Sequence, residues 1–210
     1  MKPNQVLAIY FTLFLFMVTT ALTCLISILA YPEPYLFWEY HISDLGAMLT
    51  PTLTPNPNAW IFWVGMGINV VIGLGSAIYL KPIGFKVLSA IIGISFIFVA
   101  LPTDIYVDLH RIGSVIMFFG IWIYMVLTFL IIVRPMYHIY LSLIVSSINF
   151  IYLLHSFHVI MGNNPMWQKI SFLTMFGIAL ISFVFIGQKE YYNPLIEVSL
   201  QDTRCYFKCK

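Results

Sequence analysis

The stretch that decides the fold is residues 6–30, VLAIYFTLFLFMVTTALTCLISILA, which holds no charged side chain in 25 consecutive residues. A helix needs about 20 apolar residues to cross the hydrocarbon core of a bilayer. Five further apolar runs follow between polar breaks, at residues 59–80, 87–101, 112–133, 139–161 and 170–187. The run at 87–101 is short, but it lengthens if residues 83–85 join it. The pattern predicts six transmembrane helices.

The composition of the whole chain agrees with this reading. Of the 210 residues, 61% are hydrophobic and only 9% are charged, and the mean hydropathy is +0.94. Soluble domains are about 45–50% apolar and about 25% charged. The excess apolar surface must face lipid, so a soluble enzyme, a nucleic-acid-binding protein and a disordered chain are all excluded. We predict an all-α integral membrane protein in contact with membrane lipids.

The distribution of cationic residues predicts the orientation of the chain. In a six-span model, only Arg111 and Lys169 fall on one side of the membrane. The other eight cations fall on the opposite side, at Lys2, Lys81, Lys86, Arg134, Lys189, Arg204, Lys208 and Lys210. Cytoplasmic loops carry the excess of Lys and Arg, so both termini are predicted to be cytoplasmic. We expect an up-and-down bundle over residues 1–187 in the plasma membrane, followed by a cytoplasmic tail at 188–210.

The longest connection of this model is the first outer loop, residues 31–58. It contains prolines at 32, 34, 51, 55 and 57 and an aromatic run, Tyr-Leu-Phe-Trp, at 35–38. Loops of such length without regular structure are usually functional or disordered. Aromatic side chains favour the headgroup level of a membrane. We therefore expect this loop to lie on the membrane and to re-enter the bundle in part.

Side chains capable of chemistry collect on the predicted outer face, and they come from three segments far apart in the sequence. Candidate catalytic residues are His110, Asp44, Ser43, Asp104 and Asp108. Candidate substrate-binding residues are His155, His158, Arg111, Asn164 and Trp167. A histidine that titrates near neutral pH, next to a carboxylate, is typical of acid–base chemistry, and His110 with Asp44 is the pair we expect.

Each candidate also has a structural interpretation. Asp104 caps the start of the fourth helix in one such reading, because a carboxylate accepts backbone N–H groups there. Asp108 and Arg111 lie three residues apart and would pair on the surface of a helix. Ser43 and Asp44 are typical of a turn or a helix cap. No order of His, Ser and Asp in the sequence supports a hydrolase triad.

A divalent metal is the one cofactor that the residues suggest. His155 and His158 are three residues apart on one predicted helix and would bind zinc with Asp44 or His110 as a third ligand. The signal is weak, because spacing alone identifies no third ligand. We therefore expect no cofactor and keep the metal as an alternative.

Two helices carry polar or small residues on one face. The run at 59–80 has Gly65, Asn69, Gly73 and Ala77 at intervals of four, which favours close helix packing with an interhelical hydrogen bond from Asn69. The run at 139–161 has Ser142, Ser146, Asn149 and Tyr152. These residues either line a polar path or form hydrogen bonds between helices, and the second is the commoner arrangement.

The order of these motifs resembles a known family. Tyr-His-Ile-Ser-Asp-Leu-Gly-Ala at 40–47 follows the first run, Leu-Pro-Thr-Asp at 101–104 closes the third, and Leu-His-Arg-Ile-Gly at 109–113 opens the fourth. This layout over residues 10–187 resembles the six-span membrane family known as domain of unknown function 998. The resemblance implies a fold and a membrane location, but no activity. Ile-Ser-Asp-Leu-Gly is also similar, more distantly, to a segment of autophagy modulators and of membrane proteins that remodel GPI anchors, which favours a role with lipids.

Three functions fit the sequence. The first is a protein that binds or modifies a lipid or lipid-linked substrate in a polar His/Asp pocket at the outer face. The second is an accessory subunit without chemistry of its own, which packs against other membrane proteins through its Gly65 and Gly73 face. The third is a small transporter that acts as an oligomer, although its ionisable residues lie at the membrane edges rather than at mid-depth.

Overall fold

The structure is a computed structural model that describes residues 3–132, 135–156 and 164–185. The described residues form six α-helices and one short 3₁₀ helix, with no β-strand among them. In chain order the elements are α1 (Pro3–Leu29), η1 (Ile42–Gly46), α2 (Ala59–Tyr79), α3 (Ile83–Val99), α4 (Val107–Ile132), α5 (Pro135–Ser156) and α6 (Asn164–Phe185). The prediction of an all-helical chain is confirmed, and each helix coincides with one predicted apolar run.

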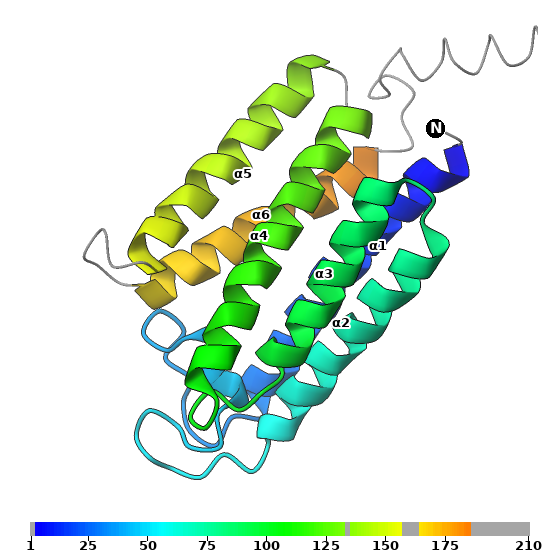
Figure 1. The fold of residues 1–210 in the computed structure, drawn as a ribbon. Helices are drawn as coiled ribbons and strands as arrows, with labels where there is room; N and C mark the ends of the chain where they lie inside the picture. The colour runs from blue at the N-terminus through cyan, green and yellow to red at the C-terminus, as the bar shows by residue number, and fades with distance from the viewer. Residues whose placement is uncertain (1–2, 133–134, 157–163, 186–210) are drawn as a thin grey trace, which may run out of the picture.

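The helices lie side by side, and successive helices run in opposite directions (Figure 1). The connections at residues 30–58 and 100–106 therefore meet at one end, which we call the loop end. Short connections at this end place α4 beside α3, while the long segment that carries η1 folds beneath α1, α2 and α6. The N-terminus lies at the opposite end (Figure 1).

Three described segments, Gln5–Leu29, Ala59–Tyr79 and Val107–Leu130, are long and apolar enough to cross a membrane. Two shorter apolar helical segments, Ile83–Val99 and Tyr140–His155, accompany them. α3 begins at Ile83, so the residues before 87 do join the short third run, as its sequence suggested.

Small residues bring α2 and α3 into backbone contact. A Cβ atom built on Gly73 would lie 2.5 Å from the Cα of Gly93, so the two backbones touch at this point. On the same face of α2, Gly65 packs against Thr23 of α1, and Asn69 Nδ2 donates to Thr20 Oγ1 at 3.1 Å. The predicted interhelical bond from Asn69 is therefore confirmed. Helices α1 and α3 of the same chain therefore cover the face of α2 that carries Gly65 and Gly73.

The polar face of α5 forms contacts between helices. Trp122 Nε1 on α4 donates to Ser146 Oγ at 3.1 Å, and Ser171 Oγ on α6 donates to Asn149 Oδ1 at 2.8 Å. Tyr152 packs against Phe118 with ring centroids 4.9 Å apart. These contacts agree with the structural interpretation for Ser146 and Asn149 rather than with a polar path, whereas the buried hydroxyl of Ser142 has no hydrogen-bond partner among the described residues.

The contact of α2 with α3 gives a direct test of the packing. We predict that Gly73→Ala destabilises the protein by about 1–3 kcal/mol, because the new methyl group meets backbone atoms that cannot rotate away. Gly75→Ala on the same helix is the control, since no heavy atom lies within 4 Å of its Cβ position. That variant should be neutral or stabilised by up to about 1 kcal/mol, because alanine favours a helix over glycine. Thermal unfolding in detergent measures both; equal effects would contradict the proposed contact.

Candidate functional site

The candidate site is built around residues 40–49, which we call the hub segment. Its centre is η1, and Leu45, Gly46 and Ala47 are buried. Within the turn, the carbonyls of His41 and Asp44 accept the N–H groups of Asp44 and Ala47, but among the described residues no backbone donor reaches the next three carbonyls, and a buried carbonyl without a partner is costly. Side chains from the surrounding elements supply the missing donors.

Seven of the ten carbonyls of the hub segment, those of residues 40, 41 and 43–47, accept a bond from a side chain of the described residues. Tyr35 Oη donates to the carbonyl of His41 at 2.8 Å, and Trp63 Nε1 of α2 donates to that of Gly46 at 2.8 Å. The other donor–carbonyl pairs are Lys169–Tyr40, Thr103–Ser43, Tyr31–Asp44, Asn56–Leu45 and Asn56–Ala47. The hub segment is thus fixed to α2, to α6 and to the connection before α4.

Two residues of the Ile-Ser-Asp-Leu-Gly motif have clear local roles. The Asp44 carboxylate accepts the backbone N–H of His41 at 2.7 Å and so caps η1, as the turn or cap interpretation of Ser43-Asp44 proposed. Gly46 leaves room for the ring of Phe62, whose Cδ1 atom would lie 2.5 Å from a Cβ at this position. The motif is therefore explained to a large extent by the geometry of the backbone.

Lys169 is the most unusual residue of the site. It lies in the first turns of α6, before the apolar run 170–187, and only 1% of its surface is exposed. Its ammonium group donates to the carbonyl of Tyr40 and lies 5.6 Å and 5.2 Å from the ring centroids of Tyr35 and Phe37. No carboxylate of the described residues forms an ion pair with it. A buried cation with a single backbone acceptor is costly, and such groups often mark functional sites.

Burial shifts three ionisable groups around the hub segment toward their neutral forms. It lowers the pKa of Lys169 to about 8, although the attraction of Asp44 opposes this shift. It raises the pKa of Asp44 and lowers the pKa of His41. The phenol groups of Tyr31 and Tyr35 have raised pKa values for the same reason. The protein therefore favours uncharged groups in this region.

A cavity lies next to the hub segment, among α1, α2, α3, α4 and α6. Its volume is about 30 Å³, or about 380 Å³ when the space that opens toward solvent is included. The smaller volume is room for about two water molecules. The residues that line it are Thr20, Ile42, Ser43, Phe62, Met66, Val99, His110, Ser114, Met117, Phe118, Gln168 and Phe172. Ser43, His110 and Gln168 form its polar wall toward the hub segment, whereas Thr20 and Ser114 are polar residues among the apolar side chains between the helices.

His110 is 6% exposed and is oriented by the backbone. Its Nδ1 lies 3.3 Å from the carbonyl oxygen of Leu101, which can only accept a hydrogen bond. The ring therefore carries a hydrogen on Nδ1, and in the neutral ring Nε2 remains an acceptor. The cavity brings His110 together with Ser43, two of the predicted catalytic residues, and with Gln168, whose Oε1 accepts the Ile42 N–H at 3.0 Å.

The predicted pair of His110 and Asp44 is not joined by a hydrogen bond or an ion pair among the described residues. The Asp44 carboxylate is bonded to the N–H of His41 instead and is attracted to Lys169. Asp104 accepts the N–H groups of Met48 and Leu49 at 3.1 Å. It therefore holds the end of the hub segment, and the interpretation of Asp104 as a cap of the fourth helix was wrong.

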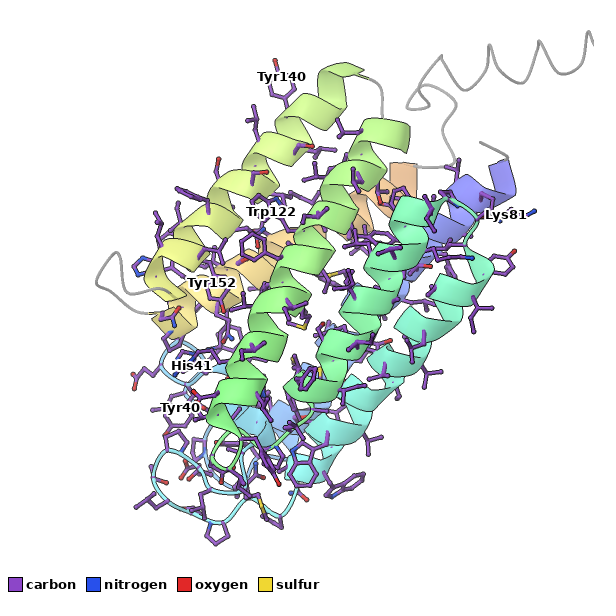
Figure 2. The ribbon with its side chains drawn as sticks, viewed as in Figure 1. Tyr40, His41, Lys81, Trp122, Tyr140 and Tyr152 are labelled. Atoms are coloured by element: carbon purple, nitrogen blue, oxygen red, sulfur yellow. The ribbon has the colours of Figure 1, made fainter. Side chains whose placement is uncertain are left out.

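The remaining predicted residues lie apart from the cavity. Asp108 and Arg111 are exposed in the first turns of α4, and the expected ion pair between them does not form. His155 is 6% exposed, stacks on Trp167 with ring centroids 5.5 Å apart, and has a buried Nδ1 without a partner. Asn164 begins α6. Figure 2 shows His41 and Tyr40 at the loop end near the start of α6, far from Lys81.

The metal alternative finds no support in the part of the chain that the structure describes. No group of three or more His, Cys, Asp and Glu side chains there is arranged to hold an ion. His158, one of the proposed ligands, lies outside the described residues, as does the predicted tail at 188–210.

Sequence reasoning did not select Lys169, Gln168, His41 or Tyr35 as site residues. One signal for Lys169 was present, because it is one of only two cations that the positive-inside rule leaves on the outer side. Gln168 acts through a bond to the backbone of a segment 126 residues away, and Tyr35 through bonds to the carbonyls of Tyr40 and His41; no spacing in the sequence encodes such contacts.

No family model, no curated protein and no solved structure matches this chain. The resemblance to the family known as domain of unknown function 998 therefore stays a prediction. The functional argument depends on the geometry of the site alone.

The buried amine of Lys169 predicts a pH dependence of stability. Its pKa is about 8 in the folded chain and about 10.5 when exposed, so the unfolded chain binds more protons between these values. Stability should therefore rise with pH between about 8 and 10. We predict that the unfolding midpoint of the wild type rises by about 4–8 °C relative to Lys169→Met over this range, the shift that about 2 kcal/mol gives in a chain of this size. Parallel pH profiles of the two proteins would contradict it.

Asp104 and Asp108 form a matched pair for a second test. Both are exposed carboxylates, four residues apart, but only Asp104 binds the hub segment. We predict that Asp104→Ala accelerates amide hydrogen exchange of residues 48–56 about tenfold, because about 1.4 kcal/mol of protection is lost. Asp108→Ala should leave exchange in this segment unchanged. A similar acceleration in both variants would show that net charge, rather than these bonds, controls the segment.

Proposed function

We propose that this chain is an integral membrane protein of six spans, which binds a lipid or a lipid-linked substrate in the cavity beside the hub segment. Both termini are cytoplasmic in this proposal, and the loop end faces out of the cell. Three membrane-capable helices and the eight-to-two distribution of cations support this orientation. Large apolar side chains exposed along the helices, such as Val71, Ile78 and Leu143, support contact with lipid.

The observation that carries the proposal is the composition of the cavity wall. Ser43, His110 and Gln168 line its hub side, whereas Met66, Phe118 and Phe172 line it between the helices. Ligand sites are typically apolar pockets with a few placed polar groups. A molecule with a polar end and an apolar body matches this wall, which reaches from the hub segment to residues about two to three turns inside the helices, such as Thr20 and Met117.

The binding role is better supported than acid–base chemistry. The catalytic pair that we expected needs Asp44 beside His110, but Asp44 caps η1 and is attracted to Lys169. Ser43 and His110 share the cavity without a hydrogen bond between them among the described residues. The side chains around the cavity therefore offer hydrogen-bonding groups for a ligand but, within the described part of the chain, no hydrogen-bonded catalytic pair.

The two other functions have less support. An accessory subunit would use the Gly65 and Gly73 face to bind a neighbour, but Thr23 and Gly93 of the same chain fill that face. A transporter would need ionisable groups near mid-depth. The buried ionisable groups that the structure describes include Lys169, His110 and His155, and all three lie near the loop end of their helices.

Native mass spectrometry of the purified protein tests the proposal. Ser114 lines the cavity on α4, so Ser114→Leu fills part of it; Ser147→Leu, exposed on α5, is the matched control. After incubation with a total lipid extract of the host membrane, we expect lipid adducts on the wild type and Ser147→Leu. We expect at least a fivefold loss of adducts on Ser114→Leu with an unchanged unfolding midpoint. Equal adducts on all three proteins would overturn the proposal.

A further inference from the structure

The residues of the cavity wall limit the chemical class of ligand that can bind there. Of the described residues that line it, the polar ones are Thr20, Ser43, Ser114, His110 and Gln168, and none is Lys, Arg, Asp or Glu. An ionised group transferred into such a wall would lose its hydration without gaining a partner of opposite charge, which costs several kcal/mol. The composition therefore disfavours an ionised ligand group.

The nearby charged residues do not change this conclusion, because their contacts lie elsewhere. The ammonium group of Lys169 donates to the carbonyl of Tyr40 and lies over two aromatic rings. The carboxylate of Asp44 caps η1. Neither residue lines the cavity. A phosphate would thus find no cation there, and a choline or ethanolamine group would find no carboxylate.

The hydrogen-bonding groups of the wall favour a hydroxyl. Thr20 Oγ1 accepts a bond from Asn69, so its own hydrogen remains free to donate. His110 gives the hydrogen of Nδ1 to Leu101, which leaves Nε2 as the acceptor of the neutral ring. A hydroxyl is the smallest group that both accepts and donates. A hydroxyl also needs little space, and the cavity has room for about two water molecules.

We infer that the cavity binds the uncharged hydroxyl end of a neutral lipid of the diacylglycerol class, and not the headgroup of a phospholipid. This inference rests on the proposed function, since it concerns the same cavity. The hydroxyl lies among Thr20, Ser43 and His110, and the acyl chains leave along the apolar wall. Lys169 and Asp44 hold the hub segment in place and do not contact the ligand.

Two probes with the same acyl chains test the inference. The purified full chain in detergent is titrated with dioleoylglycerol and with dioleoyl phosphatidic acid, and the unfolding midpoint is followed. We expect dioleoylglycerol to raise the midpoint of the wild type and of Ser147→Leu, and phosphatidic acid to bind at least tenfold more weakly. Ser114→Leu should lose the effect of dioleoylglycerol. Ser43→Ala, which changes the volume little, should weaken its binding about two- to tenfold, as the loss of one hydrogen bond predicts.

The outcomes separate the inference from the proposed function. Stabilisation by phosphatidic acid that equals or exceeds that of dioleoylglycerol, and that Ser114→Leu abolishes, would overturn the inference and leave lipid binding in place. No stabilisation by either probe would overturn the inference. The lipid adducts seen in native mass spectrometry would then be the test of the proposed function. Undiminished binding of dioleoylglycerol to both Ser43→Ala and Ser114→Leu would also overturn it, because the lipid would then bind elsewhere.

Discussion

The loop end depends on one constraint, which is that the buried backbone carbonyls of residues 45–47 must find hydrogen-bond donors. Among the described residues no backbone N–H reaches these three carbonyls, and each unpaired one would cost free energy. Asn56 and Trp63 of α2 therefore donate to them, and side chains from α6 and from two connections donate to carbonyls among residues 40–44. The same bonds fix the relative positions of these elements and so shape the adjacent cavity. The stability of this end and the shape of the cavity therefore have a common origin.

Much of the fold could be predicted from hydropathy, because apolar runs of helical length leave the chain few alternatives. The errors are instructive at α4, which begins at Val107, five residues before the predicted run. Hydropathy locates only the apolar part of a helix. Asp108 and Arg111 belong to the first turns of α4, but they are charged and exposed, so hydropathy leaves them out of the helix. The bond from Asn69 to Thr20 was predictable because a buried amide in an apolar helix must find a partner.

The site was predictable only in part. The sequence indicated that Ser43 and His110 meet at one face, and they do line one cavity. The sequence did not indicate which group each charged side chain would contact. Asp44 is attracted to Lys169, which is distant in the sequence, and Asp104 binds two amides of the hub segment rather than those of α4. Such choices depend on the tertiary arrangement of loops. Among the residues that the prediction missed, only Lys169 had a signal in the sequence, because it is a cation on the side where cations are rare.

The bonds from Gln168 and Lys169 have a consequence for how the protein is made. They join the hub segment to residues 126 and 129 positions later in the chain. Synthesis proceeds from the N-terminus, so residues 40–49 leave the ribosome long before these partners exist. The first connection therefore stays incompletely closed until α6 has been synthesised. A nascent chain that stops before α6 would lack two partners of the hub segment, so the loop end closes only when α6 arrives.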